Sequence, residues 1–110
     1  MGRFVKGDVV VLPFPFSDLS ASKKRPAFVV SQLTGDDVIL CMITTSVKAD
    51  GYSIPVTKAD FVAGGIDHDS HIRPNRLFTA DTRIVNRSAG KLATHKVNQV
   101  IAKIIEIIQS

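Results

Sequence analysis

Covalent cross-links are scarce in this sequence. It contains one cysteine, Cys41, so no disulfide can form within the chain. Cys41 lies inside the apolar run at residues 38–43, and we interpret it as a small buried hydrophobic residue rather than a reactive thiol. This composition favours a reducing compartment. With 110 residues and 45% apolar content, the chain can bury a modest core without disulfides or structural metals.

Membrane-spanning and targeting segments are also lacking. No apolar stretch approaches the roughly 20 residues that cross a bilayer. The N-terminus shows neither the long apolar core nor the small-residue cleavage pattern of a signal peptide. We therefore expect a soluble, cytoplasmic protein with no membrane partner. No internal repeat, linker or low-complexity tract interrupts the chain, so residues 1–110 are predicted to form a single domain.

Groups of metal-ligand residues are few. Asp67, His68 and Asp69 lie close together, with His71 just beyond, but the sequence has no second such group. The segment has the composition of a loop, so we interpret these residues as solvated and expect neither a metal nor a cofactor. A general acid or base role for His71 stays open, without further support from the sequence.

Positive charge exceeds negative charge. Fourteen Lys and Arg residues against ten Asp and Glu residues give a net charge of +4 and a pI near 9.5. This balance favours a polyanion or an acidic protein as the partner. Many basic proteins share it, so charge alone does not choose among these functions.

Three cations, Lys23, Lys24 and Arg25, run directly into Pro26 and the apolar residues 27–30. Proline disfavours the helical conformation for the residue before it, so Arg25 should lie extended at the entrance to a strand. A guanidinium held in that position suits a phosphate group. The alternative is that the three cations only solvate a loop and protect a strand edge.

Short apolar segments rich in β-branched residues alternate with turn residues along most of the chain. They predict strands at residues 9–12, 27–31, 38–45, 52–56 and 77–79. A glycine-containing break is expected at 63–65 and a turn at 86–90. Three hydroxyl residues, Thr44, Thr45 and Ser46, end the third strand. Several short strands with regular breaks indicate a small barrel or sandwich.

The periodicity changes after residue 93. Apolar residues then recur on one helical face, at Val97, Val100, Ile101, Ile104, Ile105 and Ile108. We expect Thr94 to be the N-cap of this helix. The apolar stripe should pack on the sheet.

Four short motifs are spread in order over nearly the whole chain. They are Gly7-Asp8-Val9-Val10, Arg25-Pro26-Ala27-Phe28-Val29-Val30-Ser31, Thr44-Thr45-Ser46, and Gly90-Lys91-Leu92 followed by the helix. Together they resemble the family of MazF, PemK and Kid toxins. The resemblance implies a mainly β fold with a C-terminal helix, in which the strands form an SH3-like small barrel of the CcdB/PemK-like type.

The resemblance also implies a function. Members of this family are homodimeric toxins of type II toxin–antitoxin systems, and a cognate antitoxin neutralises them. By this resemblance the chain is expected to be a sequence-specific, metal-independent endoribonuclease. It would cleave single-stranded RNA by attack of a 2′-hydroxyl on the neighbouring phosphate.

Single residues take their expected roles from the same resemblance. Arg25 matches the family's catalytic arginine and Thr44 its catalytic threonine, while Asp81 resembles an acid that some members use near the dimer groove. The residues expected to bind RNA are Lys23, Lys24, Thr45, Ser46, Arg73 and Arg76.

The chain departs from the family pattern at two places. Many relatives carry a glutamate shortly before the Arg-Pro pair, where this chain has Ser20, with Asp18 as the closest acid. Members with an arginine two residues before the late acid would need one at position 79, which is Thr79 here, leaving the two arginines within residues 73–76 as substitutes. The general base is therefore open, with Asp81 and Asp18 as candidates.

Two other functions stay open. A non-catalytic nucleic-acid-binding SH3-like barrel would use the same basic surface, and its main support is the unidentified general base. Toxins of the same fold that target DNA gyrase act by binding a protein. Three outcomes separate these functions. Cleavage of RNA indicates the nuclease, binding without cleavage indicates the binding module, and neither of these indicates a protein target.

Overall fold

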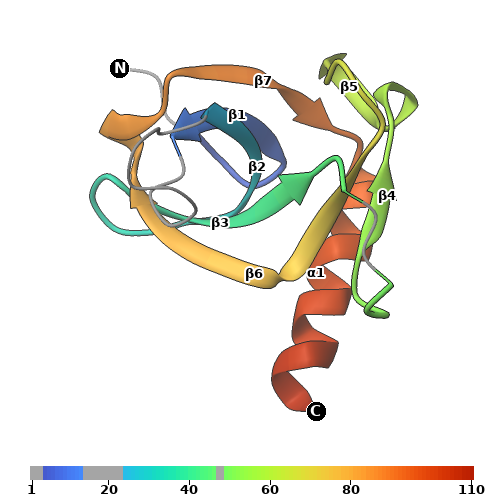
Figure 1. Cartoon of the computed structure of the whole chain (residues 1–110). Coiled ribbons are helices and arrows are strands. Elements are labelled where there is room, and N and C mark those ends of the chain that lie inside the picture. The colour runs from blue at the N-terminus through green and yellow to red at the C-terminus, as the bar shows by residue number, and fades with distance from the viewer. Residues whose placement is uncertain (1–3, 14–23, 47–48) are drawn as a thin grey trace.

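The computed structural model describes residues 4–13, 24–46 and 49–110, which form one antiparallel sheet followed by a helix (Figure 1). The strands are β1 (Asp8–Pro13), β2 (Lys24–Gln32), β3 (Asp37–Thr44), β4 (Ile54–Val56), β5 (Phe61–Gly64), β6 (Ser70–Asp81) and β7 (Arg87–Leu92). The short 3-10 helices η1 (Lys58–Asp60) and η2 (Thr82–Ile84) precede β5 and β7, and α1 (Thr94–Gln109) follows β7. The predicted mainly β fold with a C-terminal helix is confirmed.

The sheet is strongly curled. Its strand order is β4-β6-β3-β2-β1-β7-β5, and neighbouring strands are antiparallel. β6 and β7 bend around the three central strands as a half-barrel (Figure 1). The residues between β6 and β7 close one side, because the Thr82 N–H donates to the Asp36 carbonyl and the Asn86 N–H to the Val11 carbonyl, both at 2.8 Å. This is the small barrel that the family resemblance implied.

The central strands contribute side chains to two apolar cores, because successive side chains of a strand point to opposite faces. Ala27 and Val29 of β2 face the barrel core, and Phe28 between them faces the helix core. The barrel core consists of Val10, Leu12, Ala27, Val29, Val38, Leu40 and Ala80. The helix core consists of Val9, Phe28, Cys41, Ile43, Ile54, Val56, Ile72, Leu92, Val97, Val100 and Ile104.

Cys41 is fully buried in the helix core. Burial raises the pKa of its thiol well above the ordinary value, because the apolar surroundings disfavour the thiolate. The interpretation of Cys41 as a small hydrophobic residue is confirmed.

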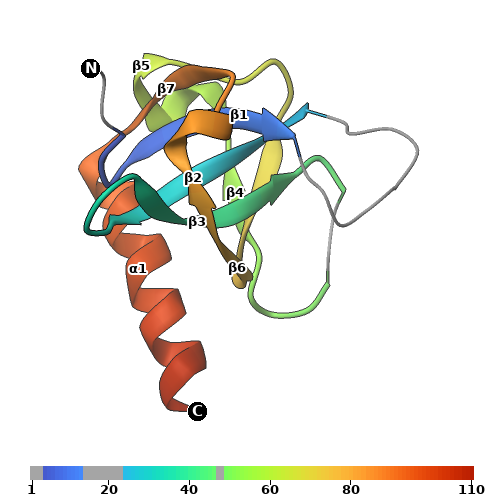
Figure 2. The same ribbon diagram turned by 90° about the vertical axis from the view of Figure 1, so that its left-hand side faces the viewer.

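The apolar stripe of α1 packs on the sheet over its first half. Val97, Val100 and Ile104 belong to the helix core, whereas Ile105 and Ile108 are 49% and 69% exposed. The reason is visible in Figure 2, where the C-terminal half of α1 runs past the strands. Within the described residues, no helix has the length and apolar character needed to cross a membrane.

The expected N-cap at Thr94 is wrong. Ala93 is the N-cap, with extended φ and ψ of −65° and 150°, and no side chain caps the helix. The Ala93 carbonyl accepts from the N–H groups of Lys96 and Val97, so Thr94 already lies within the first turn. The backbone of the preceding strand sets the start of this helix, and the hydroxyl residue does not.

The turn predicted at 86–90 is also wrong, because β7 begins at Arg87. The break predicted at 63–65 is found at its second residue, because β5 ends at Gly64, which has a φ of 65°. β5 pairs with β7, with Gly64 opposite Gly90. A Cβ added at Gly90 would collide with the Ala63 carbonyl oxygen, and one at Gly64 with the Ala89 carbonyl oxygen. These glycines permit a close approach of two backbones. In the sequence alone, a glycine with this role looks the same as a glycine in a turn.

Candidate functional site

Arg25, Thr44 and His71 lie side by side at one end of three neighbouring strands, β2, β3 and β6. The ladder between β2 and β3 pairs Ala27 with Met42, and the same register carried two residues further brings Arg25 level with Thr44. Thr44 is itself paired with His71. Residues opposite one another in an antiparallel ladder project to the same face, with Cα atoms roughly 5 Å apart. The three side chains therefore form one row, about 10 Å long across the sheet.

Arg25 lies extended in β2, as the proline after it predicts. It pairs with Leu12 of β1, and its side chain is half-buried. Its Nε is buried and has no hydrogen-bond partner within the described residues. A buried donor without an acceptor costs about 1–3 kcal/mol. This end of the sheet is therefore suited to a ligand that brings acceptor oxygens, as a phosphate does.

The Thr44 hydroxyl has one hydrogen bond to another described residue. Its Oγ1 accepts a hydrogen bond from the Ser46 N–H at 3.1 Å. A hydroxyl group also has a donor proton, which this contact leaves available for a phosphate oxygen. Turn capping and phosphate positioning are thus compatible roles for Thr44.

His71 is half-buried between Thr44 of β3 and Pro55 of β4. Its Nδ1 is buried and has no hydrogen-bond partner within the described residues. Nε2 is not among the buried atoms that lack a partner within the described residues. The row thus contains a guanidinium, a hydroxyl and an imidazole.

A bulge in β6 carries both arginines that were expected to bind RNA. Cys41 pairs with Leu77 and Ile43 with Ile72, so residues 73–76 stand opposite the single residue of β3 between them. Extra residues of this kind bend a strand and change the direction of its side chains. Arg76 is exposed within the bulge.

Arg73 is held by an acid of the preceding loop. Its Nη2 lies 3.1 Å from Asp50 Oδ2, and its side chain is 12% exposed. The Tyr52 N–H, together with the Ser53 N–H and Arg73, lowers the pKa of Asp50 to about 2 by hydrogen bonding. The charge of Arg73 is therefore largely compensated, and Arg76 is the better placed of the two for RNA.

Asp81 lies at the far end of the ladder between β3 and β6. It pairs with Asp37, and positions 37 and 44 of β3 are seven residues apart, or roughly 23 Å at about 3.3 Å per residue. Arg83 holds it there, with Nη2 2.6 Å from Oδ2. Hydrogen bonds from the Arg83 side chain, and then from its backbone N–H, lower the pKa of Asp81 to about 2. Within one chain the structure does not bring Asp81 to Arg25 and Thr44, and its catalytic role stays a prediction.

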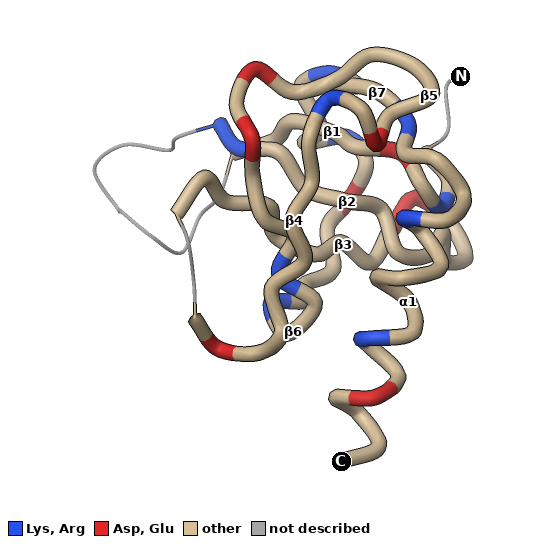
Figure 3. The backbone as a smooth tube through the Cα atoms, turned by 90° about the vertical axis from the view of Figure 1, so that its right-hand side faces the viewer, with Lys and Arg blue, Asp and Glu red and all other residues tan. Residues whose placement is uncertain are grey.

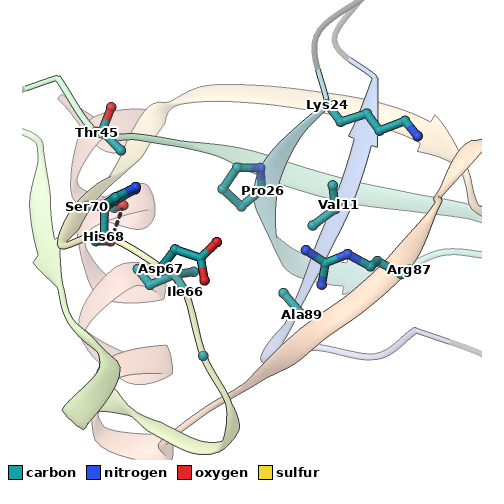
Figure 4. Close-up of a pocket in the computed structure, with 11 residues that line it drawn as sticks. Val11, Lys24, Pro26, Thr45, Ile66, Asp67, His68, Ser70, Arg87 and Ala89 are labelled. Carbon is teal, nitrogen blue, oxygen red and sulfur yellow. Dashed lines mark hydrogen bonds between the residues drawn. The ribbon is translucent and has the colours of Figure 1, made fainter.

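A cavity of about 290 Å³ opens on the other face of the same strand end. Pro26 lines it, and Arg25 does not, because adjacent residues of a strand point to opposite faces. Its polar lining residues are Lys24, Thr45, Asp67, His68, Ser70 and Arg87 (Figure 4). Lys24 and Arg87 lie on the side of β2 and β7, and the two hydroxyl residues lie across the cavity. Two residues expected to bind RNA, Lys24 and Thr45, thus share one cavity.

The remaining predicted residues are dispersed. Ser46 is exposed just after β3, while Lys23, Asp18 and Ser20 lie outside the described residues. Figure 3 shows the positive positions at the start of β2 and on β6. In the part of the chain that the structure describes, no group of three His, Cys, Asp or Glu side chains is arranged to hold a metal ion.

The order of elements and motifs is that of one protein family. Residues 5–108 match the family described as PemK-like, MazF-like toxin of type II toxin–antitoxin system. The chain belongs to this family. The match extends from the residues before β1 into the last turn of α1, so the family resemblance of the four motifs is confirmed.

Solved structures with the same fold include toxins alone and in complexes. MazF from Deinococcus radiodurans superimposes with a TM-score of 0.79 at 15% identity, over 100% of both chains. A MazE–MazF complex from the same organism gives 0.76 at 16% identity, over 98% of both chains. An endoribonuclease in complex with its cognate antitoxin from a mycobacterial species gives 0.71 at 14% identity, over 97% of this chain and 96% of that one. No curated protein matches the sequence. At these identities the likeness shows a shared fold.

The structure places two residues in positions that the sequence did not indicate. His71 stood in the sequence beside an apparent loop, and its pairing with Thr44 depends on the bulge in β6, which has no sequence signal of its own. Arg87 lay in a predicted turn, whereas in the structure it pairs with Val11 on β7 and lines the cavity. The sequence Arg87-Ser88-Ala89-Gly90 carries no alternating pattern that could have revealed it.

Proposed function

We propose that this toxin is an endoribonuclease that cleaves single-stranded RNA sequence-specifically and without a metal, through attack of a 2′-hydroxyl on the adjacent phosphate. The observation that carries the proposal is the row of Arg25 and Thr44 at one end of β2 and β3. Family membership supports the same activity. One solved structure with this fold is itself described as an endoribonuclease.

The reaction makes three chemical demands. The 2′-hydroxyl must lose its proton, the extra negative charge on the phosphorane must be stabilised, and the departing 5′-oxygen must be protonated. Arg25 meets the second demand, because its guanidinium stays charged and presents a planar set of donors. Thr44 positions the phosphate through its O–H. Neither side chain is suited to accept the proton.

The RNA would bind on both sides of this strand end. Lys24 and Thr45 line the cavity next to the row, and Arg87 adds a second cation to it. Arg76 is exposed on β6, and Ser46 follows Thr44 directly. A cavity of this size, near the lower end of small-molecule pockets, is large enough for a single flanking nucleotide. Lys23 and Arg73 complete the set of residues proposed to bind RNA.

The partners of the toxin belong to the same proposal. Two of the structures with this fold are complexes with an antitoxin, and we assign this chain a cognate antitoxin as well. We also assign it a homodimeric state in the cytoplasm. The exposed apolar residues Ile105 and Ile108 on the protruding end of α1 support a protein interface there.

Incubation of the purified toxin with a long single-stranded RNA in the presence of EDTA tests the activity. Discrete fragments ending in a 2′,3′-cyclic phosphate and a 5′-hydroxyl are expected, and a duplex of the same sequence should stay intact. Arg25→Ala, purified identically, controls for contaminating nucleases. Intact RNA that is bound by the protein would identify a binding module, and intact unbound RNA would direct the search to a protein target.

A further inference from the structure

We propose that His71 is the proton acceptor of this site, taking the 2′-hydroxyl proton through Nε2. The inference rests on the proposed ribonuclease function and supplies the group that Arg25 and Thr44 leave missing. It starts from one pairing: Thr44 of β3 stands directly opposite His71 of β6. Paired residues project to one face, so the imidazole lies beside the hydroxyl that would hold the phosphate.

The position of the ring supports this role. Nδ1 is buried without a partner within the described residues, whereas Nε2 is not among these buried, unpaired atoms. Buried polar atoms of native structures are nearly always hydrogen-bonded, so an unpaired one calls for an explanation. Arg25 Nε and Arg73 Nε are unpaired in the same way. Each arginine nitrogen is a donor, and one phosphodiester supplies several acceptors.

The residues paired with His71 on the neighbouring strands carry no charge. Thr44 faces it from β3 and Pro55 from β4, and neither side chain is charged. Charged residues on the neighbouring elements include Arg25 on β2, Arg73 on β6, Asp50 in the loop before β4 and Lys96 on α1. Asp50 is bonded to Arg73, and Asp67 and Asp69 lie four and two residues before His71 in the chain. The Lys96 ammonium is held by the Pro55 carbonyl at 3.0 Å.

The other candidate bases are less well placed. Asp81 lies at the opposite end of the ladder and is held by Arg83. Histidine is also the side chain whose charge changes nearest to neutral pH, which suits a general base. His71 is a histidine and is paired with Thr44, so it has both the acid–base chemistry and the location that a general base needs.

The step balances as follows. The 2′-O–H bond breaks and its proton passes to Nε2, while O2′ forms a bond to phosphorus and the P–O5′ bond breaks. The products are an RNA end with a 2′,3′-cyclic phosphate and an RNA end with a 5′-hydroxyl, the latter protonated by water. The imidazolium then releases its proton to water. Arg25 stabilises the phosphorane throughout.

Single-turnover cleavage between pH 5 and 9 tests the inference, on an oligonucleotide with one ribonucleotide at the mapped cleavage site. The wild-type rate should rise with pH as the base loses its proton. In His71→Gln the rate should fall by about 100-fold or more and this rise should disappear, while the affinity for an uncleavable 2′-deoxy oligonucleotide stays unchanged. His95→Gln is the matched control, because His95 lies on α1 with a 72% exposed side chain.

His71→Ala with added imidazole is the second variant. Recovery of cleavage with imidazole in this variant, but not in Arg25→Ala, would support proton transfer at position 71. A folded His71→Gln or His71→Ala that cleaves within about threefold of wild type, with the same pH dependence, would overturn the inference and leave the ribonuclease function standing. Wild-type protein that cleaves no RNA would overturn both.

Discussion

Arg25 and Thr44 are nineteen positions apart in the sequence, yet they lie level with one another at the same end of β2 and β3. Their side chains project to the same face. A guanidinium and a hydroxyl on adjacent strands, two residues beyond the pair of Ala27 and Met42, can contact one phosphodiester. The predictions for Arg25 and Thr44 rest on this relationship.

Arg25→Ala should reduce RNA cleavage by about 100-fold or more, because one oriented donor to a developing negative charge contributes at least that much in comparable sites. The melting temperature should change little, because the Arg25 Nε has no partner within the described residues to lose. Arg83→Ala removes the same charge at the other end of β6 and serves as the control. Equal losses in the two variants would indicate a general charge effect.

Two substitutions distinguish the role of the Thr44 hydroxyl from that of its branched side chain. Thr44→Val keeps the branched side chain and removes the O–H, so we expect a loss of roughly tenfold in cleavage, which corresponds to one hydrogen bond of about 1.4 kcal/mol. Thr44→Ser should retain most of the activity. Because the Thr44 hydroxyl also accepts from the Ser46 N–H, the melting temperature of each variant must be measured alongside. Wild-type cleavage by Thr44→Val would leave only the turn contact as its role.

Asp81→Asn separates a role in the turn from a catalytic role. Arg83 lowers the pKa of Asp81 to about 2 from an ordinary value of 3.8, so the carboxylate stabilises the fold above about pH 4. This contribution is lost as the pH falls towards 2. We expect Asp81→Asn to melt slightly below wild type at pH 7, the difference to vanish near pH 2, and cleavage to stay within about threefold. A large loss of cleavage with unchanged melting would instead place Asp81 in the catalytic machinery.

Gly90→Ala should destabilise the protein by about 1–3 kcal/mol, because overpacking at a close backbone contact forces the strands apart. The added Cβ would meet the Ala63 carbonyl, the Gly65 nitrogen and the Phe61 ring. Ser88→Ala, at an exposed position of the same strand, should change stability by no more than about 0.5 kcal/mol. Denaturant unfolding of both variants gives the comparison. Equal stabilities would show that β5 can move away without cost.

Several elements were predictable because their signals are local. Pro26 restricts the conformation of Arg25, so the extended arginine at the start of β2 followed from two residues. The core-facing residues of α1 followed from helical periodicity over its first three turns. The stripe failed at Ile105 and Ile108, because the sheet ends before the helix does.

Other features had no local signal. The glycines at 64 and 90 looked like turn residues, but they serve a contact between strands that are distant in the sequence. The bulge at residues 73–76 shifts the register between β3 and β6. Without that shift the partner of Thr44 is a different residue. A register shift of this kind depends on pairing energies summed over a whole ladder, which no short stretch of residues encodes.

The amino-acid sequence by itself determined that this protein has a mainly β fold with a C-terminal helix, because these depend on periodicity and on the conformational limits of proline. Its family motifs suggested Arg25 and Thr44 as site residues. Only the tertiary structure decided which residues stand beside them. It brought His71 opposite Thr44 and left Asp81 at the far end of the strand. The physical reason is that neighbours across a sheet are chosen by strand order and register, and both are properties of the closed barrel as a whole.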